Sequence, residues 1–266
     1  MQQQINWARG KPDKHVAFEW QAGSAASARQ WHKGQARSRH AIHLAAGADM
    51  TAVAAGYATE QALRAVVLSP NFSLPSPENR KLKLELPTLT KNALKLARGR
   101  ASLPRAALAL AFCGQTDQAK PKPLIDELTK RYPQDTIINS IWLPVIRAAI
   151  DLQHGNAVRA IEQLQAPSRY EAAAEFWPQY LRGQAYLNLK RGTEAATEFQ
   201  KILDHRGQAP LSVLYPLAHL GLARAAALTG DTAKSRAAFE DFFKMWKSAD
   251  ADLPILIDAK REYEKK

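Results

Sequence analysis

The stretch Arg182–Leu203, RGQAYLNLKRGTEAATEFQKIL, decides the fold of this 266-residue chain. Its alanine, leucine and aromatic positions recur at helical spacing on both sides of a turn that contains Gly192. Small residues such as Gly183 let two paired helices approach closely, and large ones such as Phe199 fill the groove between neighbouring pairs. The stretch therefore predicts an αα-hairpin, a unit that cannot bury its own apolar face and needs neighbours.

Further stretches of the chain have the same pattern. They are IRAAIDLQHGNAVRAIEQLQ (Ile146–Gln165), LARAAALTGDTAKSRAAFEDFF (Leu222–Phe243) and, more weakly, RAALALAFCGQTDQAK (Arg105–Lys120). The turn glycines of the four units are Gly114, Gly155, Gly192 and Gly230. They are separated by 41, 37 and 38 residues, a period that predicts αα-hairpins stacked into a solenoid.

The first half of the chain is less regular than the second. Residues 15–46 and 48–68 have the pattern of helical hairpins. Residues 69–88, SPNFSLPSPENRKLKLELPT, contain four prolines and are not expected to form a regular helix throughout. Pro121 and Pro123 fall where the second helix of a repeat should begin, so we expect that helix to be shifted or shortened.

The end of the chain predicts a closing helix. Asp252 and Pro254 are a helix-start signal, and the expected inner stripe consists of Ile255, Leu256 and Ala259. The lysines and the arginine that follow are expected on the solvent-exposed face of this helix. The predicted organisation has three parts: irregular hairpins with a Pro-rich basic insertion over 1–104, repeats over 105–250 and a capping helix over 251–266.

Composition limits the classes of protein to consider. Apolar residues make up 46% of the chain, which is ordinary for a folded protein. A single cysteine, Cys113, excludes an internal disulfide framework and a cysteine-ligated zinc site. The sequence contains neither an 18-residue apolar run nor an apolar leader at its start. If Met1 is the true start we expect a cytoplasmic protein, and otherwise the soluble C-terminal region of a longer regulator.

Positive charge is concentrated in the first half of the chain. The net charge is +12, with 20 Lys and Arg against 9 Asp and Glu in residues 1–133, and 17 against 16 in residues 134–266. Such asymmetry indicates a polyanion as one kind of partner and carries no information about the fold.

The chain resembles the C-terminal tetratricopeptide region of bacterial eukaryotic-type serine/threonine kinases and of some winged-helix regulators. The segments that carry the resemblance are Ile5–Pro12, Glu127–Ile150, Ala160–Gln165, Tyr180–Gly207 and Leu217–Tyr263. Four tetratricopeptide signature positions of one repeat are Gly183, Tyr186, Ala195 and Phe199. The resemblance implies a right-handed superhelix of αα-hairpins with a regulatory interaction role.

Sequence motifs of catalysis are missing. The chain has no glycine-rich kinase loop, His-Arg-Asp or Asp-Phe-Gly motif, and no phosphate-loop or dinucleotide fingerprint. His40 and His43 have metal-compatible spacing but no nearby carboxylate, Cys113 lies in an apolar stretch, and Asp204-His205 has no partnered nucleophile. We therefore expect a protein without enzymatic activity, cofactor or metal; a hydrolase hidden in the array and a decayed remnant of a larger regulator are minor alternatives.

One candidate binding surface is the concave face lined by the first helix of each hairpin. The residues predicted to lie there are Trp142, Gln153, Trp177, Tyr180, Gln184, Asn188 and Arg224. Amides would bond to the main chain of an extended peptide, and aromatic rings would cover its side chains. The alternative is that Trp142 and Trp177 are packing residues between hairpins.

The other candidate surface is a basic stretch. It contains Arg80, Lys81, Lys83, Lys91, Lys95 and Arg98, and three of them, from Lys91 onward, are expected to form one helical stripe opposite Leu89 and Ala93. Such a face suits phosphates or an anionic membrane surface, although a plain solvated face is the alternative. The leading interpretation is a non-catalytic scaffold that binds a peptide or domain of a signalling protein, and the second is a nucleic-acid or anionic-surface binder.

Overall fold

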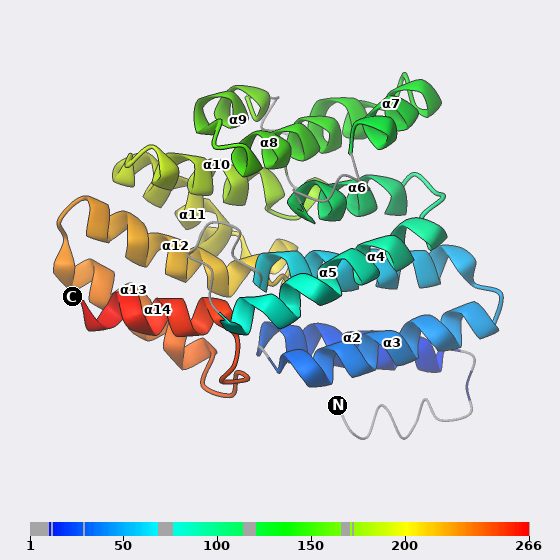
Figure 1. Cartoon of the computed structure of the whole chain (residues 1–266), viewed down its shortest axis with the longest axis horizontal. Helices are drawn as coiled ribbons and strands as arrows, with labels where there is room; N and C mark the ends of the chain where they lie inside the picture. The colour runs from blue at the N-terminus through cyan, green and yellow to red at the C-terminus, as the bar shows by residue number, and fades with distance from the viewer. Residues whose placement is uncertain are drawn as a thin grey trace.

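The chain folds into helices. The computed structural model describes residues 11, 13–28, 30–68, 77–113, 121–165, 171 and 173–265, with residues 77–84 described by their backbone alone. Within these ranges helices account for all the regular structure, and no strand is present (Figure 1). The predicted all-α class is confirmed.

The helices of the first half agree with the sequence in most places. They are α2 (Lys14–Ser27), α3 (Trp31–Gly47), α4 (Thr51–Leu68), α5 (Pro77–Leu96), α6 (Ser102–Cys113) and α7 (Lys122–Arg131). Of residues 69–88, which were not expected to form a regular helix throughout, 77–88 are part of α5 and 69–76 lie outside the described residues, so the expectation for the whole stretch stays a prediction. Proline is tolerated at the first turn of a helix, and the interior Pro87 is exposed. The short α7 matches the effect expected of Pro121 and Pro123.

The second half contains the hairpins that the repeats predict. Its elements are the π-helical turn η1 (Ile138–Trp142), α8 (Leu143–Gln153), α9 (Ala157–Gln163), α10 (Trp177–Asn188), α11 (Gly192–Asp204), the 3₁₀ turn η3 (Arg206–Gln208), α12 (Leu214–Leu228), α13 (Thr232–Met245) and α14 (Pro254–Glu264). Gly155 and Gly230 form the expected turns, with φ of +79° and +78°. Gly114 lies outside the described residues.

The hairpins are stacked side by side. Each of the pairs α8–α9, α10–α11 and α12–α13 packs against itself, and the first helices form a continuous layer in which α4 contacts α6, α6 contacts α8, α8 contacts α10, and α10 contacts α12. Figure 1 shows this progression from the N-terminal helices around to the C-terminal ones. Because the apolar face of each hairpin is covered by its neighbours, one core runs through the array.

Phe199 is the packing centre of the α10–α11–α12 region. Its side chain is fully buried, and its ring lies between Gly183 of α10 and Gly221 of α12. A Cβ added at either glycine would come within 2.6 Å of the ring. Gly192 does not form the turn expected of it; it begins α11, where an added Cβ would lie 2.7 Å from the carbonyl oxygen of Ala225.

A buried arginine ties α10 to its surroundings. The Arg182 guanidinium donates to Glu198 of α11 through Nε at 2.9 Å, to Glu171 through Nη2 at 3.0 Å, and to the carbonyl oxygen of Leu164 through Nη1 at 2.9 Å. All three charged side chains are about nine-tenths buried. The network fixes the helix that presents one wall of the site described below.

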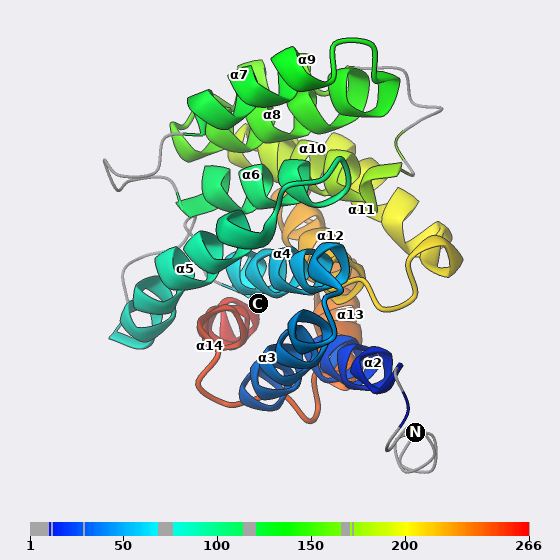
Figure 2. The same ribbon diagram turned by 90° about the vertical axis from the view of Figure 1, so that its right-hand side faces the viewer.

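The two ends of the array meet. Figures 1 and 2 show α2 and α3 beside α13 and α14, although these helices are at opposite ends of the sequence. The backbone N–H of His32, at the start of α3, donates to Asp250 in the loop between α13 and α14 at 3.0 Å. Gly23 of α2 lies against Leu211, in the loop before α12.

The predicted closing helix is α14. Its inner stripe is buried as expected, with Ile255, Leu256 and Ala259 at most 5% exposed. Leu253 stands at its N-cap, and Asp252 points instead toward His32. Among the described residues, no helix is long and apolar enough to cross a membrane.

Candidate functional site

A groove lies between the first helices of the last two hairpins and the closing helix. Its volume is about 670 Å³. The residues that line it are Gln184, Leu187 and Asn188 of α10, Lys190 after it, Arg224, Ala227 and Leu228 of α12, Phe239 of α13, Glu262 of α14, Lys265, and Gly155 of the α8–α9 turn. We call it the α10–α12 groove. It brings together three of the seven residues predicted for the concave face: Gln184, Asn188 and Arg224.

An ion pair forms one side of the α10–α12 groove. The Arg224 guanidinium donates to both carboxylate oxygens of Glu262, through Nε at 2.9 Å and through Nη2 at 2.8 Å. Burial alone would lower the pKa of Arg224, but the hydrogen bonds and charge of Glu262 outweigh it and raise that pKa. The two-pronged contact fixes the orientation of both side chains and joins α14 to α12.

The rest of the groove combines apolar and amide side chains. Leu228 is 39% exposed, and Leu187 is partly exposed and also lines the groove. Asn188 is exposed, whereas Gln184 is largely buried and contributes to the groove from its floor. Lys190 and Lys265 are exposed cations in the lining. Such a lining offers apolar contact, hydrogen bonds and charge over a small area.

The aromatic residues predicted for the concave face are not on a surface. Trp142 and Trp177 are 4% exposed and Tyr180 is 8% exposed. Trp177 packs against Phe112 with ring centroids 5.6 Å apart, and Tyr180 packs edge-on against Phe199 at 6.2 Å. The prediction that these three rings face a partner is wrong, because the gaps between stacked hairpins take large rings, and the alternative of packing residues is correct.

Gln153 also lies away from the α10–α12 groove. It is partly buried at the end of α8, and its Nε2 is buried without a hydrogen-bond partner. The groove reaches this hairpin only through Gly155. The predicted face is therefore reduced to its last two hairpins.

A second groove runs along the opposite helices of the same two hairpins. It has a volume of about 850 Å³ and lies between α11 and α13, with α12 beneath. Its lining includes small residues such as Ala196, Ala226 and Ala237, and polar ones such as Thr197 and His219. Burial lowers the pKa of His219, which favours its neutral form. We call it the α11–α13 groove, and the sequence did not indicate it.

The described part of the basic stretch lies on the surface. Lys91 and Lys95 are exposed on α5, and Ala93 and Ala97 on the other side are buried. Arg98 is exposed too, but it lies beyond Leu96, the last residue of α5. The predicted stripe therefore continues past the end of the helix. The side chains of Arg80, Lys81 and Lys83 lie outside the described residues.

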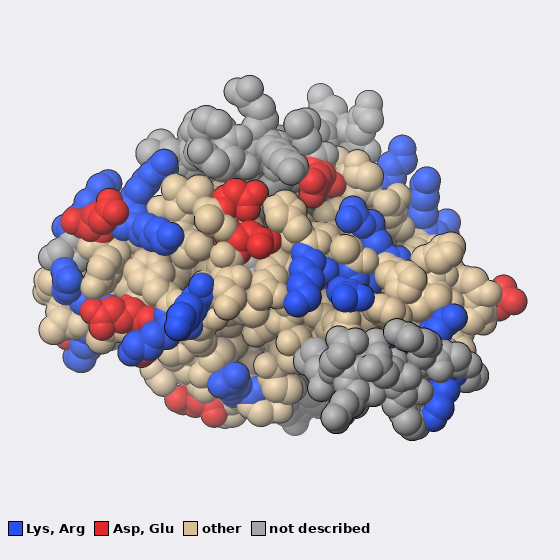
Figure 3. Space-filling model, turned by 90° about the horizontal axis from the view of Figure 1, so that it is seen from below, with Lys and Arg blue, Asp and Glu red and all other residues tan. Residues whose placement is uncertain are grey.

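Charges of both signs share the surface elsewhere. On the face seen in Figure 3, Lys and Arg side chains are spread widely, and several have Asp or Glu beside them. The described residues on this face do not form a single continuous basic area of the kind that follows a nucleic-acid backbone.

The residues tested for catalytic or metal chemistry have ordinary surroundings. His40 is exposed and packs edge-on against Phe18 with centroids 4.3 Å apart. Burial raises the pKa of the Cys113 thiol, which disfavours the nucleophilic thiolate. The Nδ1 of His205 donates to the carbonyl oxygen of Lys201 at 2.8 Å, so this histidine is tied to its own helix.

A polar cluster is buried between α2, α3 and α4. Oε1 of Glu19 lies 2.9 Å from Nη2 of Arg64, and the Arg64 guanidinium also pairs with Glu60. The Ser38 hydroxyl donates to the other carboxylate oxygen of Glu19, Oε2, at 3.5 Å. Burial, opposed by Arg64, raises the pKa of Glu19 to about 7. Nearby, Nδ1 of His15 lies 3.0 Å from the Tyr57 hydroxyl. Two carboxylates thus share one buried guanidinium.

No protein-family model matches the chain, and no curated protein matches its sequence. The resemblance to the tetratricopeptide regions of kinases and regulators therefore stays a prediction.

Sequence reasoning missed the contribution of the closing helix to the α10–α12 groove. Lys265 was expected on a solvent-exposed outer face, but it lines the groove, and so does Glu262, for which no position was predicted. The only available signal was that Glu262 stands on the flank of a helix whose other side is apolar, and this does not reveal which neighbouring helix it meets.

Proposed function

We propose that this chain is a non-catalytic interaction scaffold of the tetratricopeptide type, which binds an extended peptide of another protein in the α10–α12 groove. The observation that carries the proposal is the lining of that groove, where Leu187 and Leu228 are accessible beside the amides of Gln184 and Asn188. A scaffold for a signalling partner is also what the resemblance implies.

The chemistry of the groove supports a peptide as its occupant. Asn188 and Gln184 can donate to and accept from a peptide main chain, which exposes both kinds of group along its length. Leu228 and Leu187 offer apolar contact to alternate side chains. The Arg224–Glu262 pair and the two lysines add a rim of charge that can select a sequence.

The test begins with peptides selected from a random display library on the intact chain. Their dissociation constants are then measured by fluorescence anisotropy for the wild type, Leu228→Asp and Val158→Asp. Val158 is the matched control, because it is 58% exposed on α9 and does not line the groove. We expect Leu228→Asp to weaken binding about tenfold or more, which is about 1.4 kcal/mol, and Val158→Asp to leave it unchanged.

Two results would contradict the proposal. One is a set of peptides that bind the wild type and Leu228→Asp equally well. The other is failure to select any peptide that binds with a dissociation constant below about 1 mM, the weakest affinity that a specific site of this size should give. Asn188→Ala serves as a second groove variant, and because Asn188 is exposed the substitution leaves the core intact.

A second candidate function is binding of nucleic acid or an anionic surface through α5. The observation in its favour is the exposure of Lys91, Lys95 and Arg98 beside a buried apolar face. Phosphate contacts release counterions, so binding of a single-stranded RNA should weaken steeply between low and moderate salt. Lys91→Glu/Lys95→Glu should abolish this binding while Lys130→Glu/Lys260→Glu keeps it, and salt-independent binding would argue against phosphate contacts.

A further inference from the structure

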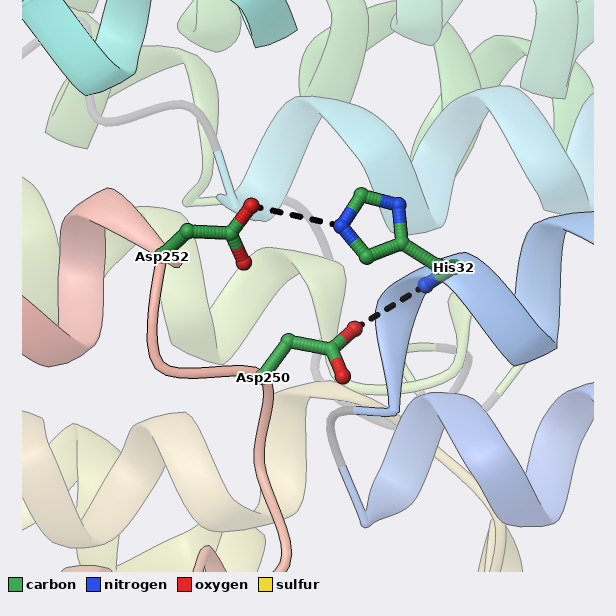
Figure 4. A group of neighbouring side chains, drawn as sticks. All are labelled: His32, Asp250 and Asp252. Atoms are coloured by element: carbon green, nitrogen blue, oxygen red, sulfur yellow. Dashed lines mark hydrogen bonds and ion pairs between the residues drawn. The ribbon is translucent and has the colours of Figure 1, made fainter.

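Three metal-ligating side chains meet where the two ends of the array touch. His32 stands at the start of α3, and Asp250 and Asp252 stand in the loop between α13 and α14 (Figure 4). The ligand atoms that these residues offer lie within 4.8 Å of one another. The histidine is 218 and 220 residues away from the two aspartates in the chain. The cluster thus exists only because the fold closes on itself.

The positions of these three residues are fixed by buried neighbours. Trp31, directly before His32, is 5% exposed, and Leu253, directly after Asp252, is 2% exposed. The Asp250 carboxylate is held through Oδ2, which accepts the backbone N–H of His32 at 3.0 Å. Nε2 of His32 lies 3.2 Å from Oδ2 of Asp252. Ligands fixed in this way lose little entropy when they bind an ion.

Within the described part of the chain, no lysine or arginine balances the charge of the cluster. Asp252 contacts His32 at 3.2 Å, and neither Asp250 nor Asp252 pairs with a described Lys or Arg side chain. The two carboxylates bring negative charge that a divalent cation, bound by them and by a ring nitrogen of His32, would neutralise. The side chains of His32 and Asp252 are 55% and 59% exposed, so an ion can reach them.

We propose that His32, Asp250 and Asp252 form a binding site for a divalent transition-metal ion of the zinc type. One imidazole nitrogen and two carboxylate oxygens match the donor set that zinc accepts, and water can complete a four-coordinate shell. The ion takes the place of the direct contact between His32 and Asp252, because ligand bonds of about 2.0–2.2 Å need it to sit between these two groups. Its effect is to fasten the first hairpin to the loop that precedes the closing helix.

The site lies apart from the α10–α12 groove, since its three residues are not in the groove lining. Binding of an ion here adds no chemistry to the groove. It stabilises the closed arrangement of the array, because the folded state holds the three ligands together and the unfolded chain does not.

The test is calorimetric titration of the chelator-treated full chain with zinc chloride. We expect one site with a dissociation constant on the order of micromolar for the wild type and a zinc-dependent rise in the thermal midpoint. His32→Ala, Asp250→Asn and Asp252→Asn should each weaken the site about tenfold or more. Asp250→Asn retains an oxygen that can accept the His32 N–H, so it removes the charge and not the hydrogen bond.

His43→Ala is the matched control, because His43 is an exposed histidine on the same helix and belongs to no such cluster among the described residues. Zinc binding that survives all three cluster substitutions, or that is lost equally with His43→Ala, would overturn the proposal. Failure of the wild type to bind zinc would also overturn it. Thermal melts of the metal-free variants, expected to match the wild type, show that any loss of binding is not a loss of folding.

Discussion

The packing around Phe199 leads to a sharp prediction about Gly221. Replacement of a helical glycine by alanine normally stabilises a protein, since alanine is favoured in a helix interior by about 1 kcal/mol. Here an added Cβ at Gly221 would lie 2.6 Å from three atoms of the Phe199 ring. The ring has little room to move aside, because it is fully buried and packs on its other side so close to the Gly183 backbone that a Cβ built there would lie 2.6 Å from it. We therefore expect Gly221→Ala to destabilise the fold.

The magnitude follows from the two opposing effects. Forced overpacking of a buried ring costs about 1–3 kcal/mol, and the upper end applies because the overlap is with a rigid group held on both sides. Subtraction of the helix-propensity gain of about 1 kcal/mol leaves a net loss of about 2 kcal/mol. In a chain of this size that corresponds to a fall in the thermal midpoint of roughly 4–8 °C.

The assay is urea unfolding followed by helical circular dichroism, with Gly56→Ala as the control. Gly56 lies inside α4, and nothing lies within 4 Å of a Cβ built there. Gly56→Ala should gain about 0.5–1 kcal/mol. Phe199→Leu combined with Gly221→Ala should cost less than the sum of the two single changes, since the clash is removed. Equal stability of Gly221→Ala and Gly56→Ala would refute the described packing.

Two further predictions concern buried charges. Arg182→Met leaves the buried Glu171 without its cation and Glu198 with Lys201 alone, and should cost about 3–5 kcal/mol by urea unfolding. Arg191→Met breaks an exposed pair and should cost less than about 1 kcal/mol, so similar losses for the two variants would contradict a buried network. Burial, opposed by Arg64, raises the pKa of Glu19 from 4.5 to about 7, so its favourable contribution is present below pH 4.5 and is lost as pH rises through 7. The urea midpoint of the wild type relative to Glu19→Gln should therefore fall from pH 5 to pH 8, and a constant difference would show that Glu19 does not titrate there.

The helices and hairpins could be predicted from the sequence because their signals are local. Glycines at a period of 37 to 41 residues, helical spacing and the start of α14 near Pro254 all depend on neighbours in the chain. The proline content of residues 69–88 predicted only that a regular helix does not run throughout them, and it did not reveal that α5 begins at Pro77 and continues through Pro87. A proline at the first turn costs a helix little, and the neighbours of α5 supply apolar burial that outweighs the loss at Pro87.

The binding surface could be predicted only in part, because exposure depends on contacts between distant segments. Tryptophan and tyrosine, the residue types at 177 and 180, often line peptide-binding sites, but they also fill the spaces between hairpins. Their spacing within a helix does not distinguish the two roles. Glu262 contacts Arg224 in the α10–α12 groove because α14 packs beside α12, and His32 contacts Asp250 because the two ends of the array pack together. These contacts join residues too far apart in the chain for any local pattern to reveal them.

The central claim is that a peptide occupies the α10–α12 groove, and hydrogen–deuterium exchange with and without a selected peptide tests it most directly. We expect the peptide to slow exchange in residues 184–190 and 224–228 and to leave residues 193–201 and 234–241, along the α11–α13 groove, unchanged. Protection confined to the α11–α13 groove, or to residues 91–98 of the basic stretch, would contradict the claim and place the binding surface elsewhere.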